Sequence, residues 1–271
     1  MTPPRFAAVL GFTISTAIAC AALAQKTEAP PPTAVAPAEE KPYEPREGQK
    51  GKDVVWLPTH QALVEKMLDM AKATPKDYVM DLGSGDGRTV ITAAKRGIRA
   101  LGIEYDPNMV ELSMRNAAKE GVAEKAKFVK ADLFKTDFRR ATVITMFLLP
   151  EINIRLRPRM LELEPGTRIV SNSFDMGDWE ADETEILDAS SGCDGYCTAR
   201  LWIVPAKVAG RHKTAQGDLT LKQTFQKVKG TLRKEGKDIP VEGKVVGHDV
   251  TLTVEGREIR GTMKGRQLAL S

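Results

Sequence analysis

From Trp56 onward, the spacing of apolar residues alternates between helical and extended patterns. After Thr59, which can cap a helix, apolar residues recur every three or four positions. Further helices are expected around 90–94, 107–121 and 154–163, and strands at 78–82, 98–104, 127–131, 143–148 and 168–173. Strands separated by such helices pair in parallel through right-handed crossovers. The late strands 185–189 and 198–204 are joined by a short turn, so an antiparallel hairpin is expected at the end of an α/β sheet.

After Pro205 the pattern changes to short alternating segments separated by glycines. It predicts a β-meander, either a small appended sheet or a partial barrel, with strands at 219–225, 241–246, 250–254 and 258–263. From Lys207 onward there are 14 Lys or Arg against 7 Asp or Glu, a net charge of +7 within a chain of +4. We interpret this as a solvated basic face, and contact with an anionic or membrane-proximal surface is the alternative.

The first 24 residues differ from the rest of the chain. Arg5 is their only charge, an apolar run covers 6–24, and the run closes on Ala22-Leu23-Ala24, a pattern that signal peptidase accepts. The pattern predicts a signal peptide over 1–24, and therefore an exported, periplasmic or extracellular protein. A membrane anchor over 6–24 is the main alternative, and lipid modification of Cys20 is a weaker one.

The predicted domain organisation has four parts. The Pro-rich segment 25–50 follows the signal peptide, and it is expected to be an extended, solvated linker because proline fixes φ and removes backbone donors. The α/β domain occupies 51–206 and the basic β-meander 207–271.

Composition narrows the class of protein further. With 271 residues, 42% hydrophobic and 28% charged, the chain has room for one large or two small globular domains. Three cysteines are too few for a disulfide scaffold, but Cys193 and Cys197 flank turn residues and are predicted to form a disulfide after export. The histidines stand singly without metal-ligand spacing, so no metal site is predicted; they are His60, His212 and His248.

The strongest motif lies between the first predicted strand and the next helix. It reads Asp81-Leu82-Gly83-Ser84-Gly85-Asp86-Gly87-Arg88, with glycine at every second position of the loop. Glycines let the backbone turn sharply and let a ligand approach it closely. Arg88 stands where a dinucleotide fingerprint has its last glycine, and the carboxylates of Asp81 and Asp86 would repel a pyrophosphate. A cationic ligand such as S-adenosylmethionine (SAM) suits these carboxylates better.

Other acidic residues stand at the ends of the following strands. Glu104 closes the second strand and is placed to accept hydrogen bonds from ribose hydroxyls. Asp132 follows the third strand, where it could bind an adenine amino group with Leu133 beside the ring. The predicted SAM-binding residues are therefore Asp81, Gly83, Ser84, Gly85, Asp86, Gly87, Glu104, Asp132 and Leu133.

On these residues the chain resembles a known family. The 81–88 motif is similar to that of the seven-β-strand methyltransferases related to the ATP synthase c-subunit lysine methyltransferase, and the resemblance runs from about Trp56 to Trp179. It includes the Phe147-Leu148-Leu149-Pro150 stretch and the segment 174–179. The resemblance implies a Rossmann-like class I methyltransferase sheet and SAM-dependent N-methylation of protein lysine. By position and resemblance, Pro58 and Thr59 cover the methionine end of SAM.

The acceptor side of the reaction is less defined. Enzymes that methylate nucleobases or glutamine amides usually carry Asn/Asp-Pro-Pro-aromatic after the fourth strand, and this chain has Leu148-Leu149-Pro150-Glu151. We therefore expect a protein substrate and no nucleic acid. Glu151 is a candidate to orient the amine, although an acid beside the helix dipole is equally expected there. Asp175, with Trp179, is a second candidate, at the substrate entrance, against an ordinary loop with a packed tryptophan.

Two other functions remain open from the sequence. One is a methyltransferase for a small-molecule or lipid-linked substrate. The other is a non-catalytic protein with a SAM fold that works through its basic β-domain. The joint presence of Asp81, Glu104 and Asp132 argues against the second, because an idle pocket has no need of all three.

Overall fold

The computed structural model describes residues 42–271, which form one unit from Pro42 to Ser271. The signal peptide or anchor predicted at 1–24 and the first part of the predicted linker lie outside the described residues. In the part that is described, no helix is long and apolar enough to cross a membrane.

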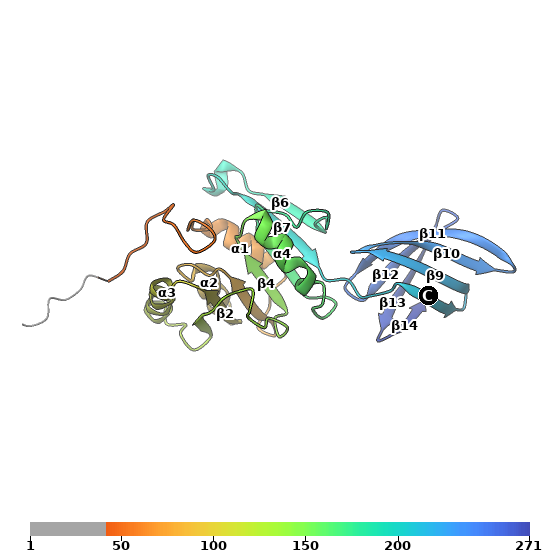
Figure 1. The fold of residues 1–271 in the computed structure, drawn as a ribbon, viewed down its shortest axis with the longest axis horizontal. Helices are drawn as coiled ribbons and strands as arrows, with labels where there is room; N and C mark the ends of the chain where they lie inside the picture. The colour runs from red at the N-terminus through yellow and green to blue at the C-terminus, as the bar shows by residue number, and fades with distance from the viewer. Residues whose placement is uncertain (1–41) are drawn as a thin grey trace, which may run out of the picture. The chain divides into compact units, whose positions relative to one another are not determined.

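A seven-stranded sheet with the order β3-β2-β1-β4-β5-β7-β6 forms the first domain (Figure 1). Its strands are β1 (Tyr78–Leu82), β2 (Arg99–Glu104), β3 (Ala126–Lys130), β4 (Val143–Met146), β5 (Arg168–Asn172), β6 (Glu183–Ile186) and β7 (Thr198–Ile203). Strands β1 to β5 pair in parallel, and β7 pairs antiparallel with both β5 and β6. The predicted α/β fold class with its antiparallel terminal hairpin is confirmed.

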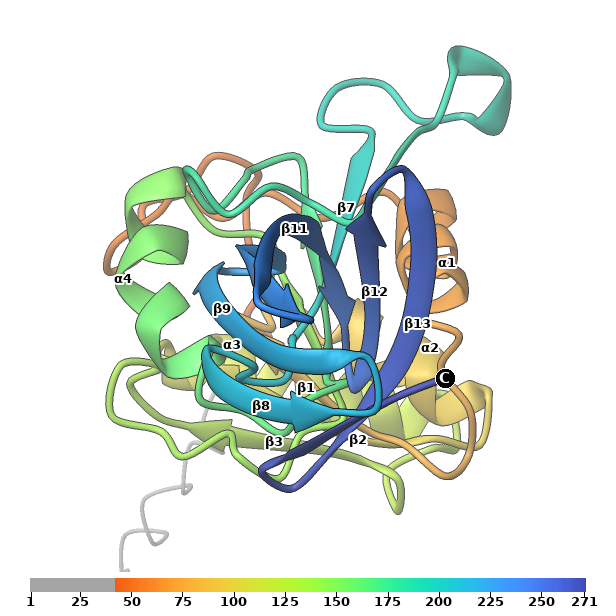
Figure 2. The ribbon, with the colours of Figure 1, turned by 90° about the vertical axis from the view of Figure 1, so that its right-hand side faces the viewer.

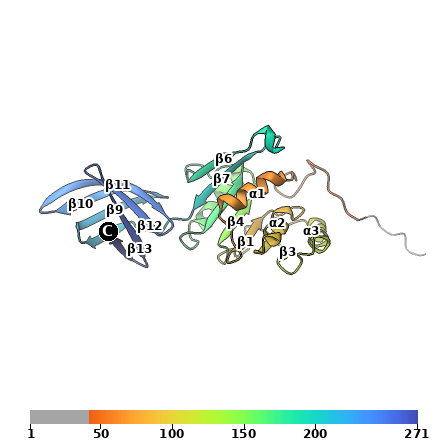
Figure 3. The same cartoon turned by 180° about the vertical axis from the view of Figure 1, so that it is seen from behind.

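Helices cover both faces of this sheet. They are α1 (Gln61–Met70), α2 (Arg88–Lys95), α3 (Pro107–Lys119) and α4 (Pro150–Met160). Figure 3 shows α1, α2 and α3 on one face, and Figure 1 shows α4 on the other. Alternate strand residues fill the two cores, as strand geometry requires: Val79 packs with the first three helices, and Met80 packs on the side of α4. The sheet is therefore buried on both faces.

Some element boundaries differ from the predicted ones. The N-cap of α1 is His60, whose Nδ1 accepts the Ala62 N–H, and not Thr59. Helix α4 begins at Pro150 instead of 154, because proline suits the first helical position. Strand β6 ends at Ile186, since the Asp188 carboxylate accepts the N–H groups of the next residues and starts a short 3₁₀ helix, Ala189–Ser191.

The second sheet is a seven-stranded antiparallel meander in chain order (Figure 2). Its strands are β8 (Gly210–Thr214), β9 (Gly217–Thr224), β10 (Lys227–Lys234), β11 (Lys237–Val246), β12 (Asp249–Val254), β13 (Arg257–Lys264) and β14 (Gln267–Leu270). Only four of them were expected from the sequence. Gly230 looks like a strand break but lies inside β10, where a Cβ would collide with the Thr220 carbonyl oxygen of β9. The glycine allows close backbone approach within the sheet.

Two tryptophans and Phe225 form an aromatic stack beneath the first sheet's last strands. Trp179 is fully buried, with its ring centroid 6.3 Å from that of Trp202 and 6.0 Å from that of Phe225, at the β9–β10 turn. The Trp202 Nε1–H donates to the Trp179 carbonyl oxygen at 2.7 Å. Trp179 is thus a core residue and not part of a substrate entrance.

The N-cap of α3 is expected to contribute measurably to the stability of this fold. Asp106 Oδ1 accepts the Asn108 N–H at 2.9 Å. We expect Asp106→Ala to lower the free energy of unfolding by about 1 kcal/mol, measured by urea denaturation, because an N–H at the helix start loses its acceptor. Asp106→Ser, which keeps a capping oxygen, should stay close to wild type. An equal loss in both variants would contradict the capping role.

Candidate active site

A cavity opens at the carboxyl ends of β1, β2 and β4, where ligands bind in open parallel sheets. Its wall combines the loops after β1, β3 and β4, the end of β2 and the segment 49–59. We call it the carboxylate cavity, because six acidic residues line it: Asp53, Asp81, Asp86, Glu104, Asp106 and Asp132.

The glycine loop after β1 uses its own amide groups. Gly83 and Gly85 have φ values of +78° and +53°, which favour glycine. The N–H groups of Gly83 and Ser84 donate to the Ile103 carbonyl oxygen, and the Gly85 N–H donates to Glu104 Oε2 at 2.9 Å. Amides already bonded within the chain are not available to phosphate oxygens. The loop therefore differs from a pyrophosphate cradle.

Asp81 is a buried carboxylate at the last-but-one position of β1. Its Oδ1 accepts a hydrogen bond from Thr145 Oγ1 at 2.6 Å, from the neighbouring strand β4. The pKa of Asp81 is raised to about 7, mainly by burial; the Thr145 hydrogen bond lowers it, and the negative charges of Glu104 and Asp86 contribute to the rise. No cationic side chain among residues 42–271 pairs with Asp81. A cationic ligand would remove this electrostatic cost.

Glu104 joins the glycine loop to the end of β2. Its Oε1 accepts the N–H groups of Tyr105 and Asp106 at 2.7 and 3.0 Å, while Oε2 accepts that of Gly85. Three backbone donors hold the carboxylate in one orientation. Each oxygen retains acceptor capacity for a ligand hydroxyl.

Two further acids of the cavity, Asp86 and Asp132, have cationic partners. Asp86 forms a bidentate pair with Arg88, with Nη2 to Oδ2 at 2.7 Å, and Arg88 Nη1 also donates to the Thr59 carbonyl oxygen. Lys52 Nζ lies 3.0 Å from Asp132 Oδ2, and this bond holds the pKa of Asp132 below its usual value. Asp132 therefore stays ionised near neutral pH.

Lys52 belongs to a hairpin that sequence reasoning did not find. Residues 48–56, the N-terminal hairpin, pair through Gly48 N–H to Trp56 O, Trp56 N–H to Gln49 O and Gly51 N–H to Val54 O, each 2.9 Å. The end of the segment predicted to be a solvated linker is thus folded. A Cβ on Gly85 would lie 2.6 Å from Trp56 Nε1, so the Trp56 ring packs against the glycine loop. The only sequence signal was the Trp56-Leu57-Pro58-Thr59 stretch of the resemblance.

Most of the residues predicted to bind SAM lie on the carboxylate cavity. They are Pro58, Thr59, Asp81, Gly83, Ser84, Gly85, Asp86, Glu104, Asp132 and Leu133. Gly87 does not line it; this residue is the N-cap of α2 and packs against Phe128 and Ser113. The assignment of these residues to SAM itself stays a prediction.

The two candidate catalytic acids do not line the cavity. Glu151 is an exposed residue in the first turn of α4, where the helix dipole favours an acid. Asp175 is also exposed, and its Oδ1 accepts the Gly177 N–H at 3.1 Å, which stabilises a turn. Their positions give no support to a proton-transfer role. Cys193 and Cys197 are bonded to each other in the loop between β6 and β7.

Comparison with known proteins places this site in a family. The model of the ANTKMT methyltransferase domain matches residues 81–183. The chain is 42% identical over 163 residues to a protein-lysine N-methyltransferase of Saccharolobus islandicus, covering 59% of this chain and 96% of that protein. The chain belongs to this methyltransferase family. The ATP synthase c-subunit lysine N-methyltransferase of Rattus norvegicus is 35% identical over 130 residues, 48% of this chain and 60% of that enzyme.

A solved structure identifies the methyl donor of the family. The crystal structure of an RNA methyltransferase from Salinibacter ruber, in complex with S-adenosyl-L-homocysteine, is 43% identical with a TM-score of 0.52. It covers 56% of this chain and 96% of that one. The chain is therefore a SAM-dependent methyltransferase. The carboxylate cavity fits this donor, because the buried Asp81 has no cationic partner within residues 42–271 and the loop offers few free amides to a phosphate.

The buried charge of Asp81 leads to a prediction for Asp81→Asn. The pKa of Asp81 in the folded wild type is about 7, above the ordinary value of 3.8. The free energy of unfolding therefore falls as pH rises from about 4 to 7, by about 4 kcal/mol in total, because the folded state must then hold an ionised buried carboxylate. In thermal denaturation from pH 4.5 to 8.5, the stability of the variant relative to wild type should increase up to pH 7. Above pH 7 the difference in stability should stay constant. SAM binding should be lost in the same variant.

Thr145→Val is the matched control for this titration. It removes the hydrogen bond that lowers the Asp81 pKa, so the fall in stability should shift to higher pH than in wild type. A stability difference between Asp81→Asn and wild type that does not change with pH would contradict the assignment of the titration to Asp81.

Proposed function

We propose that this chain transfers the methyl group of SAM to the ε-amino group of a lysine in a protein exposed outside the cytoplasm. The observation that carries the proposal is the 42% identity to a protein-lysine N-methyltransferase across 96% of that protein. The match to the family model, residues 81–183, contains Asp81, Asp86, Glu104 and Asp132.

The carboxylate cavity would hold SAM through charge and hydrogen bonding. Asp81 is assigned to the methionine amino group, and Glu104 to the ribose hydroxyls. Asp132 and Leu133 are assigned to the adenine. Pro58 and Thr59, which line the same cavity beside the N-terminal hairpin, cover the methionine end. These assignments give the carboxylates of Asp81, Glu104 and Asp132 a hydrogen-bond donor from the ligand.

Methyl transfer from SAM requires little direct chemical participation by side chains. SAM, when bound, supplies a methyl group activated by its positively charged sulfur. The chain's residues align a neutral amine with that group and keep water out, which is the main contribution of a protein to a displacement of this kind. Phe147, Leu148 and Ile152 give the cavity an apolar wall next to the β4 loop.

RNA is the competing acceptor, since the Salinibacter ruber protein is described as an RNA methyltransferase. The residues after β4 argue for protein instead. This loop reads Phe147-Leu148-Leu149-Pro150, without the Asn/Asp-Pro-Pro-aromatic pattern of nucleobase enzymes. Exposed acids, Glu151 and Asp175, stand next to it and after β5, where they would repel phosphates.

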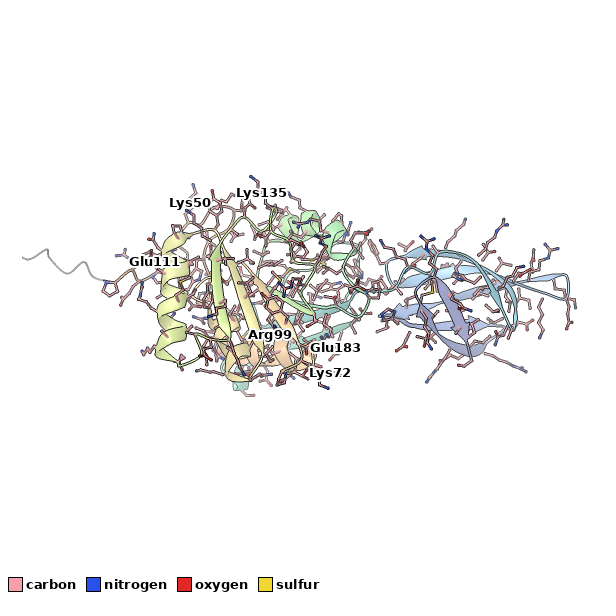
Figure 4. All side chains as sticks on the ribbon, turned by 90° about the horizontal axis from the view of Figure 1, so that it is seen from below. Lys50, Lys72, Arg99, Glu111, Lys135 and Glu183 are labelled. Atoms are coloured by element: carbon pink, nitrogen blue, oxygen red, sulfur yellow. A yellow bond between two sulfur atoms is a disulfide. The ribbon has the colours of Figure 1, made fainter. Side chains whose placement is uncertain are left out.

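The basic second sheet supports a place near an anionic surface, such as a membrane that carries the substrate. All fourteen Lys and Arg side chains from Lys207 onward are exposed, and Figure 4 shows side chains projecting from both sides of this sheet. Attraction of such charges to anionic lipid amounts to about 1 kcal/mol for each residue near the surface.

Methyl transfer can be tested with the purified chain from Gln25. We expect SAM labelled in its methyl group to label lysine in proteins of a membrane fraction, identified as methyllysine after hydrolysis. Gly85→Arg should abolish SAM binding by calorimetry, because its side chain enters the space occupied by Trp56. Label in nuclease-sensitive RNA, and none in protein, would replace the lysine proposal with RNA methylation.

Export can be tested in a Gram-negative host. The full chain should be cleaved before Gln25 and recovered from the periplasm, with the mass of the mature protein measured directly. Ala24→Arg should block cleavage, because signal peptidase accepts a small residue there. An uncleaved wild-type chain in the membrane fraction would favour the anchor over 6–24 instead.

A further inference from the structure

Three aromatic rings from three separate loops meet beside the carboxylate cavity. They are Phe147 after β4, Phe174 after β5 and Tyr196 before β7, and we call them the aromatic cluster. The ring centroids of Phe147 and Tyr196 lie 5.3 Å apart, those of Phe174 and Tyr196 5.8 Å, and those of the two phenylalanines 6.0 Å. Tyr196 remains 50% exposed, so the cluster is open to solvent on its side.

The aromatic cluster lines a hollow that is separate from the carboxylate cavity but adjoins it. Leu149, Leu57 and the 50–55 part of the N-terminal hairpin complete its wall. Phe147 and Leu57 line both spaces, as do residues 51–55. A side chain that enters the hollow is therefore separated from the donor site only by these shared residues.

The backbone around Tyr196 is constrained, and this constraint holds its ring in the aromatic cluster. It lies between Gly195 and Cys197, inside the loop closed by the Cys193–Cys197 disulfide, and its φ is +52°, a value that non-glycine residues rarely adopt. Cys193 is buried and anchors the loop. Such strain persists where the surroundings hold it in place, and it is common at ligand sites.

The charges near the hollow suit a basic segment of a substrate. Each loop that supplies an apolar wall also carries an exposed acid within two residues: Glu151 near Leu149, Asp175 after Phe174 and Asp194 before Tyr196. On the opposite wall, Lys52 is paired with Asp132 and Asp53, and Lys50 extends into solvent at the edge of the domain (Figure 4). Exposed acids this close in sequence to the apolar wall attract a cationic peptide, whereas the wall itself is mainly apolar.

We infer that this hollow receives the acceptor lysine, with its methylene stem against the leucines and its amino group against the aromatic faces. The inference rests on the proposed function and adds the site of the acceptor. Ring faces attract an ammonium, and removal from water favours its neutral form. At the donor site the nitrogen–carbon bond forms as the carbon–sulfur bond breaks, the bonding electron pair passes to sulfur, and the amine proton leaves to water.

The experiment measures binding and turnover separately in the mature chain. The probe is the peptide acetyl-Gly-Gly-Lys-Gly-Gly-amide, with alanine in place of lysine as the control peptide. Binding is followed by saturation-transfer NMR with S-adenosylhomocysteine present, and turnover by labelled SAM. Tyr196→Leu and Phe174→Leu keep an apolar side chain but remove one ring face each, and Tyr196→Phe keeps the ring.

We expect the two leucine variants to weaken lysine-peptide binding, and to raise its KM, by between about threefold and thirtyfold. Tyr196→Phe should match wild type, and SAM affinity should be unchanged in all three. Cys193→Ser combined with Cys197→Ser should behave like Tyr196→Leu, because the loop that holds Tyr196 is then open.

The outcomes separate the two proposals. Equal affinity and KM in wild type and both leucine variants would overturn the acceptor hollow, even if lysine is methylated. If wild type binds SAM but labels no lysine, the proposed function fails; the NMR comparison then still decides the hollow. In that case, lysine-selective binding that is lost in Tyr196→Leu supports it, and equal binding of the lysine and alanine peptides refutes it.

Discussion

The structure depends on a carboxylate held away from water at the end of β1. Asp81 and Thr145 are register partners on adjacent parallel strands, so the hydroxyl reaches the carboxylate without any loop having to place it. The rest of the site is arranged around this charge. Glu104 fastens the glycine loop above it, and the N-terminal hairpin closes over the loop through Trp56. The cost of burying this charge thus falls on a residue that lines the cavity, and such costs are common at functional sites.

Donor and acceptor sites share a wall made of unrelated parts of the chain. Phe147 comes from the stretch after β4 that carries the family resemblance, whereas Tyr196 comes from a disulfide loop outside residues 81–183. The family framework supplies the donor site, and loops attached to it supply the surface that meets the substrate. Such a division allows one fold to serve different acceptors.

The sequence predicted those features that are encoded locally. The glycine motif, the strand-end Glu104 and the start of the helix at 107 lie within short segments whose residue types determine their geometry. Features that join distant segments were not predictable. The Lys52–Asp132 pair and the contact of Tyr196 with Phe147 depend on the tertiary fold, because each joins residues that are far apart in the sequence. Neither produces a periodic pattern along the chain.

The second sheet shows a different limit. Gly230, Gly243 and Gly261 lie inside strands, where neighbouring backbones approach too closely for a side chain, whereas other glycines of the same sheet, such as Gly236 and Gly256, lie in turns. Gly230 thus concealed β10, although the alternation on either side of it is regular. Composition alone could not distinguish these two uses of glycine.

The carboxylates of the cavity also have a consequence for turnover. Methyl transfer converts a sulfonium into an uncharged thioether, so a cavity lined by carboxylates attracts the spent molecule less strongly than the donor. The same fixed charges that favour binding of the donor therefore favour its replacement after the methyl group has been transferred. An enzyme that works with a scarce donor gains from this asymmetry, because its used donor competes less for the site.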